Sequence, residues 1–436
     1  MSRTNLLPTL LLASIICDSA CAEQGCPDLG APRHLGIPSG QDAALIMGPS
    51  KRVKAPTHRV PFPSGSLDTV SISLSRSLCY GSCPSYSVEL KGDGSAHYTG
   101  KRFVLVGGIH SYDVSIDRVR CLLSHLKQAN FWSLSNKYVA DITDGPTYSV
   151  SVTIGAKTKT ITDYFGTAVG MPVAIKAIED EIDSIGADTW VRGSSDTVSY
   201  LQKEGFDFHS QAAAVMLANA AAKAPDALVI GLIEAGAPVI DQTPGHLPAV
   251  VRAASTGRTA IVQALIAKGA FSDGSPEVKE DALISAAGSG NPLTVAEILK
   301  YQPDVNAQDK EGNTALINMW NSQYGGKDKS KTDIPAVTRL LLEAGADPNI
   351  PNRSGSTALF SATSAEAVNL LIEAGGKIDV MNQYGSTPLL FTGTDEAAAA
   401  LIQAGADTSV VNKLGETIEK IATTRKFTKT LQILRK

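Results

Sequence analysis

Hydrophobic and polar residues alternate along short segments of the chain between residues 67 and 193. Alternation of this kind is typical of strands that bury one face. It occurs in four segments: 70–74, 86–90, 148–154 and 158–164. Apolar residues instead recur at helical spacing over 115–129 and 172–185, which predicts two helices with one buried face each. Residues 67–193 are therefore predicted to form a compact α+β domain.

A different pattern, an apolar helical stretch followed by a glycine, recurs throughout residues 194–436. Six copies carry the glycine and one carries glutamine: Gly205, Gly236, Gly269, Gln302, Gly345, Gly375 and Gly405. The separations are 30 to 33 residues, with one of 43, which indicates a repeat of about 33 residues with one insertion. A residue that tolerates positive φ is expected after the second helix of each copy. The pattern predicts about six helix pairs plus terminal caps.

The repeated half resembles the ankyrin repeat family from about Val198 to Lys436. The resemblance rests on segments such as Gly312-Asn-Thr314-Ala-Leu316 and Glu343-Ala-Gly345-Ala-Asp347. It implies an all-α solenoid that binds a protein partner through its turn tips and its concave helix face. The predicted fold is thus an α+β N-terminal domain followed by an all-α ankyrin-type solenoid.

The resemblance assigns candidate partner-binding residues to the turn tips. They are Asp241, Gln242, Gln308, Asp309, Lys310, Asn352, Arg353, Asn382, Gln383, Tyr384, Asn412 and Lys413. Tyr384 is the first choice, because tyrosine is enriched at the energetic centres of protein interfaces. The insertion at 323–333, rich in Gly and Lys, is either a tolerated surface loop or a further contact loop.

Charge and composition narrow the possible functions. The 436 residues include 39 basic and 43 acidic side chains, so the net charge is −4 and no global basic field exists to bind nucleic acid. Gly-x-Ser-x-Gly and complete phosphate-binding loops are missing from the sequence. The carboxylates Glu179, Asp180, Glu181 and Asp183 are expected to form a solvated helix face rather than a catalytic pair. We expect a protein-binding, non-enzymatic chain with no cofactor and no metal.

The N-terminus is typical of a cleaved secretory signal over residues 1–22. Arg3 precedes an apolar run over 6–16, and Ala20 and Ala22 form the expected cleavage pattern. We expect export, most simply to a periplasm, with a lipoprotein anchored through Cys21 or full secretion as alternatives. No later segment has the length of a membrane span. Residues 23–66, rich in Pro, Gly and Ser, are predicted to be a flexible linker.

Cleavage would leave four cysteines, Cys26, Cys79, Cys83 and Cys121, which allow three disulfide pairings. Cys79 and Cys83 are the easiest pair to close. The surrounding Leu78-Cys79-Tyr80-Gly81-Ser-Cys83-Pro84 resembles a domain of exported bacterial proteins that has no assigned activity, over about residues 68–190.

The alternative function is a copper-binding or thiol-redox module at Cys79 and Cys83, with the repeats as a targeting arm. Their Cys-x-x-x-Cys-Pro spelling is similar to that of copper-delivering thioredoxin-like proteins. Such sites need a helix N-terminus after the second cysteine to lower the thiol pKa. Here the alternation over 86–90 predicts a strand, which favours a structural disulfide.

Overall fold

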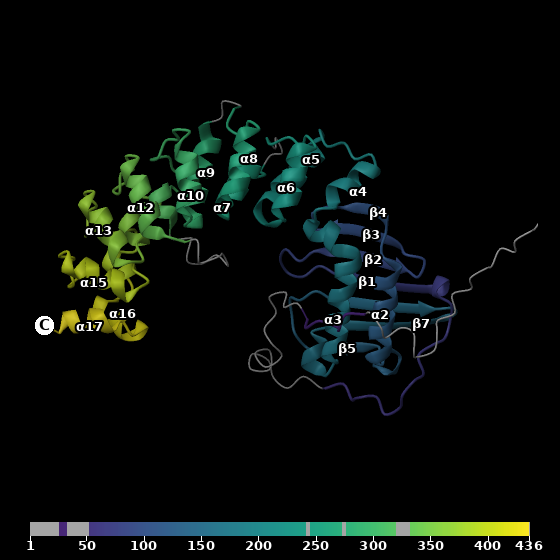
Figure 1. Cartoon of the computed structure of the whole chain (residues 1–436). Helices are drawn as coiled ribbons and strands as arrows, with labels where there is room; N and C mark the ends of the chain where they lie inside the picture. The colour runs from purple at the N-terminus through teal and green to yellow at the C-terminus, as the bar shows by residue number, and fades with distance from the viewer. Residues whose placement is uncertain (1–25, 33–51, 241–244, 273–275, 320–331, 436) are drawn as a thin grey trace, which may run out of the picture. The chain divides into compact units, whose positions relative to one another are not determined.

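The computed structural model separates the chain into two units, Met1–Glu204 and Gly205–Lys436 (Figure 1). Helix α4, Thr197–Lys203, belongs to the first unit, so the division follows Glu204 rather than the predicted boundary at Gly193. Within the part of the chain that the structure describes, no helix is long and apolar enough to span a bilayer. The described residues are 26–32, 52–240, 245–272, 276–319 and 332–435.

The first unit contains a sheet of seven strands among its described residues, in the order β4-β3-β2-β1-β6-β7-β5. Neighbouring strands are antiparallel except for β5 and β7, which are parallel. The four alternating segments are confirmed as strands, whereas the edge strands β4 and β5 were not predicted. The strands are β1 Val70–Arg76, β2 Ser85–Lys91, β3 Ser95–Arg102, β4 Gly108–Asp113, β5 Lys137–Val139, β6 Tyr148–Ile154 and β7 Lys157–Tyr164.

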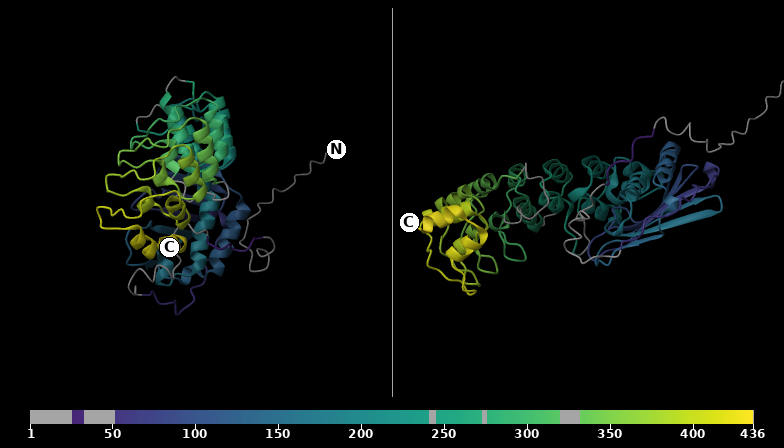
Figure 2. Two further views of the ribbon diagram at one scale, coloured as in Figure 1. Left: turned by 90° about the vertical axis from the view of Figure 1, so that its left-hand side faces the viewer. Right: turned by 90° about the horizontal axis from the view of Figure 1, so that it is seen from below.

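Two helices, α2 Ile116–Gln128 and α3 Val173–Ile182, cover one face of this sheet, as predicted (Figures 1 and 2). The chain continues from α3 through two wide helical turns over Asp183–Ala187 and Thr189–Gly193, which place Trp190 in the core. The covered face is apolar, and the side chains of β1, β6 and β7 that point the other way are mostly Ser and Thr.

Parts of the predicted linker over 23–66 pack on this unit instead of spacing it from another. Cys26 forms a disulfide with Cys121, the Val53 amide donates to the Val169 carbonyl at 2.7 Å, and the rings of Phe62 and Trp132 lie 5.3 Å apart. A segment of mostly polar residues can thus still pack on the sheet unit through a few residues such as Val53 and Phe62. Residues 1–25, with the predicted signal, and 33–51 lie outside the described residues.

The second unit is helical. Its helices are α5 Gln211–Lys223, α6 Asp226–Glu234, α7 Ala249–Ser255, α8 Thr259–Ala267, α9 Pro276–Ser289, α10 Pro292–Leu299, α11 Ala315–Asn318, α12 Ile334–Glu343, η8 Ala358–Ser361, α13 Ala365–Glu373, α14 Pro388–Phe391, α15 Asp395–Gln403, α16 Ile418–Arg425 and α17 Thr428–Leu434. They pack in two rows. One row runs α5, α7, α9, α11, η8, α14, α16, and the other α6, α8, α10, α12, α13, α15, α17.

The residue that follows the second helix of each pair has positive φ, as predicted. The angle is 92° at Gly345 and 52° at Gln302, the one non-glycine in this position. A left-handed residue ends the helix and turns the chain toward the next pair. The turns between pairs project from the same side of the two rows (Figure 2).

Candidate functional site

Each of the last turns of the helical unit is built around one asparagine. The Asn382 side-chain oxygen accepts hydrogen bonds from the backbone amides of Tyr384 at 3.0 Å and Ser386 at 3.1 Å. Its side-chain amide donates to the Ser356 hydroxyl of the preceding turn at 3.3 Å. Asn412 makes the same set of bonds one copy later, with Ser386 as the hydroxyl partner. Both asparagines are buried by these contacts.

Earlier turns use the same position in the same way. Asn352 accepts from the amides of Ser354 and Ser356 and donates to the Asn313 side chain at 2.8 Å. Asp309 accepts from the amides of Glu311 and Asn313. We call these four residues, Asp309, Asn352, Asn382 and Asn412, the turn anchors. The structure thus places four predicted partner-binding residues inside the turns, where their polar atoms hold the backbone.

Backbone bonds join each turn to the next. The Arg353 amide donates to the Glu311 carbonyl at 3.0 Å, the Gln383 amide to the Ser354 carbonyl at 2.8 Å, and the Lys413 amide to the Tyr384 carbonyl at 3.1 Å. A surface fixed in this way loses little conformational entropy when a ligand binds to it.

The exposed apolar side chains of the last two turns flank their anchors. Tyr384 is 55% exposed, and it is accompanied by Met381 at 60%, Val411 at 56% and Leu414 at 76%. We call these four residues the tip patch. Tyr384 was predicted as a contact, and the other three were missed. Their signal lies in the repeat register, because the last two turns each carry an apolar residue one position before the asparagine and another two positions after it.

The remaining predicted tip residues differ in their exposure and in their hydrogen bonds. Lys310, Arg353, Gln383 and Lys413 are exposed beside the anchors, and the Lys413 ammonium donates to the Gln383 carbonyl at 2.9 Å. Gln308 is also exposed, but its side chain bridges the Gly312 and Pro351 carbonyls. Asp241 and Gln242, and nearly all of the predicted insertion at 323–333, lie outside the described residues.

Three of the four predicted carboxylates, Glu179, Asp180 and Asp183, are buried and Glu181 is half-buried, which corrects the prediction of a solvated face. Glu179 is only 1% exposed, and its carboxylate lies 2.6 Å from the Lys176 ammonium. The ammonium also lies 3.8 Å from Asp163 and 3.5 Å from the centre of the Tyr148 ring. Asp183, equally enclosed, accepts from the Tyr86 hydroxyl at 2.6 Å. Glu179 follows Ile175 by four positions, so helical spacing places it on the apolar stripe.

Burial governs the protonation of this cluster. It raises the pKa of Glu179 well above the ordinary glutamate value, with Lys176 opposing the shift and Asp163 adding to it. Burial alone would lower the pKa of Lys176, but the Glu179 carboxylate holds it above the usual lysine value. Burial also raises the pKa of Asp183 to about 6, against the hydrogen bond from Tyr86. Lys176 is thus the buried cation that both Glu179 and Asp163 face, which is a structural arrangement.

The cysteine motif closes a short loop. Cys79 and Cys83 form a disulfide with Cα atoms 5.5 Å apart, which confirms the predicted pair. Strand β2 begins two residues later, so no helix N-terminus faces these sulfurs. Among the described residues, no three His, Cys, Asp or Glu side chains gather as metal ligands would. His97 contacts Ser111 and His110 contacts Glu204, each within the sheet unit.

The part of the sequence that forms the sheet and its two covering helices matches a known family model. The match covers residues 70–186, from the first residue of β1 to the wide turn after α3, and the family is described as a domain of unknown function (DUF6438).

Proposed function

We propose that this chain is an exported, non-enzymatic protein-binding protein, and that its helical unit is an ankyrin-type solenoid. Two rows of helices, positive φ at intervals of about 33 residues and turns that project from one side all support this architecture. Paired cysteines at disulfide distance support folding in an oxidising compartment such as a periplasm.

The tip patch is the observation that carries the proposal. Four large apolar side chains stand more than half exposed on turns that hydrogen bonds hold rigid. Large apolar side chains exposed to water cost solvation free energy, and a group of them on one surface is typical of binding sites. Tyrosine and methionine are also enriched at protein interfaces. Exposed Arg353, Gln383 and Lys413 supply the polar rim that such an interface needs.

The copper or thiol-redox alternative has less support. The Cys79–Cys83 loop runs into a strand, whereas a low thiol pKa in a Cys-x-x-x-Cys motif depends on a helix N-terminus or a nearby cation. Thiol counting and copper titration of the purified chain test it directly. Copper binding at Cys79 and Cys83 would support the alternative function.

The proposal is tested by crosslinking and mass spectrometry on full-length protein in the exported fraction. We expect Tyr384→Ala combined with Leu414→Ala to weaken capture of the partner at least about ten-fold, because each truncation removes a contact of hot-spot size. Leu293→Ala is the matched control, since Leu293 is 69% exposed on α10, away from the turns. Equal capture by the double variant and the control would refute binding through the tip patch.

A further inference from the structure

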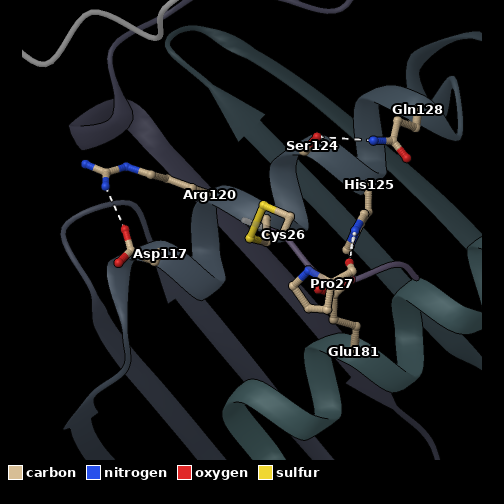
Figure 3. Close-up of a disulfide and its surroundings, with 9 residues drawn as sticks. Cys26, Pro27, Asp117, Arg120, Ser124, His125, Gln128 and Glu181 are labelled. Carbon is tan, nitrogen blue, oxygen red and sulfur yellow. Dashed lines mark hydrogen bonds and ion pairs between the residues drawn. A yellow bond between two sulfur atoms is a disulfide. The ribbon is translucent and has the colours of Figure 1, made fainter. Parts of the chain in front are cut away.

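The segment 26–31, which we call the N-terminal strap, crosses the two helices that cover the sheet. Together with α2 and α3 it walls a pocket of about 380 Å³. Asp117, Arg118 and His125 line the pocket from α2, and Asp180 and Glu181 line it from α3. Figure 3 shows Cys26 and Pro27 of the strap between the labelled residues of α2 and Glu181 of α3.

Two described contacts attach the strap. Cys26 is bonded to Cys121 of α2, with the two Cα atoms 5.4 Å apart. One ring nitrogen of His125 lies 3.1 Å from the Pro27 carbonyl, and the other lies 2.8 Å from a Glu181 oxygen. His125 is only 4% exposed in this arrangement. The strap therefore occupies one ring nitrogen of His125 and helps to keep this side chain almost fully buried.

Apart from the disulfide, little burial holds the strap in place. Pro27, Asp28, Gly30 and Ala31 are exposed, only Leu29 is half-buried, and none of these residues belongs to a helix or strand. A segment with so little buried apolar surface opens at a small free-energy cost. The pocket beside the strap is lined by charged side chains, with Asp28 on the strap and Arg118, Asp180 and Glu181 on the helices.

We propose that the N-terminal strap is a redox-controlled lid, closed by the Cys26–Cys121 disulfide and released when that bond is reduced. A dithiol reductant attacks one sulfur as a thiolate, and the mixed disulfide then resolves. The S–S bond takes up two electrons and two protons and becomes the thiols of Cys26 and Cys121. The reductant leaves as its own disulfide. Both cysteines are partly exposed, so a thiolate can reach them.

The second disulfide provides a matched control. Cys79–Cys83 closes a loop between β1 and β2, and it makes no covalent link to the strap. Its reduction should leave the lid closed. The double variant Cys79→Ser/Cys83→Ser therefore separates the effect of Cys26–Cys121 from a general effect of reducing conditions.

The test measures modification of His125 by diethyl pyrocarbonate in the full chain, followed by mass spectrometry. We compare oxidised wild type, dithiothreitol-reduced wild type with blocked thiols, Cys26→Ser/Cys121→Ser and Cys79→Ser/Cys83→Ser. We expect His125 to react about ten-fold faster in the reduced protein and in Cys26→Ser/Cys121→Ser, because local opening controls access to it. Cys79→Ser/Cys83→Ser under oxidising conditions should match oxidised wild type.

Two results would overturn the lid. One is a His125 rate that does not change when Cys26–Cys121 is lost, because the strap would then stay closed without its disulfide. The other is a parallel acceleration at His110, whose side chain is only 11% exposed and does not line the pocket, and which would report unfolding of the whole sheet unit. Circular dichroism of the same samples records whether the fold is retained.

Discussion

The two units bury different kinds of polar group. The sheet unit encloses charges, with Lys176 between Asp163 and Glu179 and with Asp183 beneath Tyr86. The buried polar side chains described in the helical unit are neutral except for Glu297, and they include Asn382 and Asn412, each bonded to a serine of the turn before it. A buried charge needs a partner of opposite sign, and removing that partner is costly. A neutral amide needs only hydrogen bonds, which the neighbouring copy supplies.

This difference predicts which substitutions should destabilise each unit most. The charges of the sheet unit come from β7 and α3, and its disulfides close loops as long as 95 residues, so its stability depends on contacts between distant segments. The helical unit repeats the same local interaction from one turn to the next. Damage there should be smaller per substitution and should stay close to its site.

The largest effect is expected from Lys176→Met. The substitution leaves Asp163 buried without its cation, so the free energy of unfolding of the sheet unit should fall by about 3 to 5 kcal/mol. Hydrogen exchange of the sheet peptides in increasing urea measures it. Lys157→Met, at an exposed position of β7, is the control and should change little. A similar small loss in both variants would mean that the buried pair contributes nothing.

Asp183 should make the sheet unit less stable as pH rises. Its folded pKa of about 6 lies above the ordinary aspartate pKa of 3.8, so the folded chain binds more protons between these two values. The stability that protonated Asp183 contributes is full below about pH 4 and is lost by pH 6 or above, about 3 kcal/mol in all. Asp183→Asn should remove this part of the slope in urea titrations at pH 4 and 6.5.

A matched carboxylate separates the Asp183 effect from the titration of exposed groups. Asp113, exposed on β4, serves for this purpose as Asp113→Asn. If Asp113→Asn and Asp183→Asn give the same dependence on pH, burial does not govern the Asp183 carboxyl group.

The two disulfides should contribute unequally. Cys26 and Cys121 are 95 residues apart, whereas Cys79 and Cys83 are 4 apart. The entropy of loop closure in the unfolded chain makes the longer link about 2 to 3 kcal/mol more stabilising. Chemical unfolding of the two Cys→Ser double variants compares them. The proposed lid makes this difference in stability smaller, because a released strap regains conformational freedom in the folded state as well. A larger loss of stability from removing Cys79–Cys83 than from removing Cys26–Cys121 would contradict the prediction.

The smallest effect is expected in the helical unit. Gln302 adopts positive φ, which costs a residue with a side chain about 1 kcal/mol relative to glycine. Gln302→Gly should therefore raise the stability of the helical unit by about 0.5 to 1 kcal/mol. Gly345→Ala should lower it by about 1 kcal/mol through the backbone alone, since no atom lies near enough to touch the new methyl group. Thermal unfolding should show a higher melting temperature for Gln302→Gly and a lower one for Gly345→Ala. Shifts in the same direction would contradict the prediction.

Sequence reasoning worked where an interaction is local or repeated. Alternation located β1, β2, β6 and β7, and the register of the repeats identified Gln302 as a substitute for glycine. It missed β4, because Gly-Ile-His-Ser-Tyr-Asp has no regular apolar alternation, and β5, which has only three residues.

Contacts between distant segments were beyond that reasoning. The pairing of Cys26 with Cys121 depends on how the strap meets α2, and the sequence left three pairings open. The α3 carboxylates were read as solvated because carboxylates seldom lie in a core, although Glu179 shares the spacing of Ile175 and Ile182. The tip residues stay predicted contacts, and which of them hold the backbone and which face solvent is decided by individual hydrogen bonds.

The turn anchors have an evolutionary consequence. Because Asn382 and Asn412 bond mainly to backbone amides and to one serine, these bonds do not depend on the side chains of the tip patch beside them. Folding and recognition are thus encoded at separate positions of the same short loop. New specificities can arise by exchanging the flanking residues alone, and each copy along the array can diversify without a penalty to its neighbours.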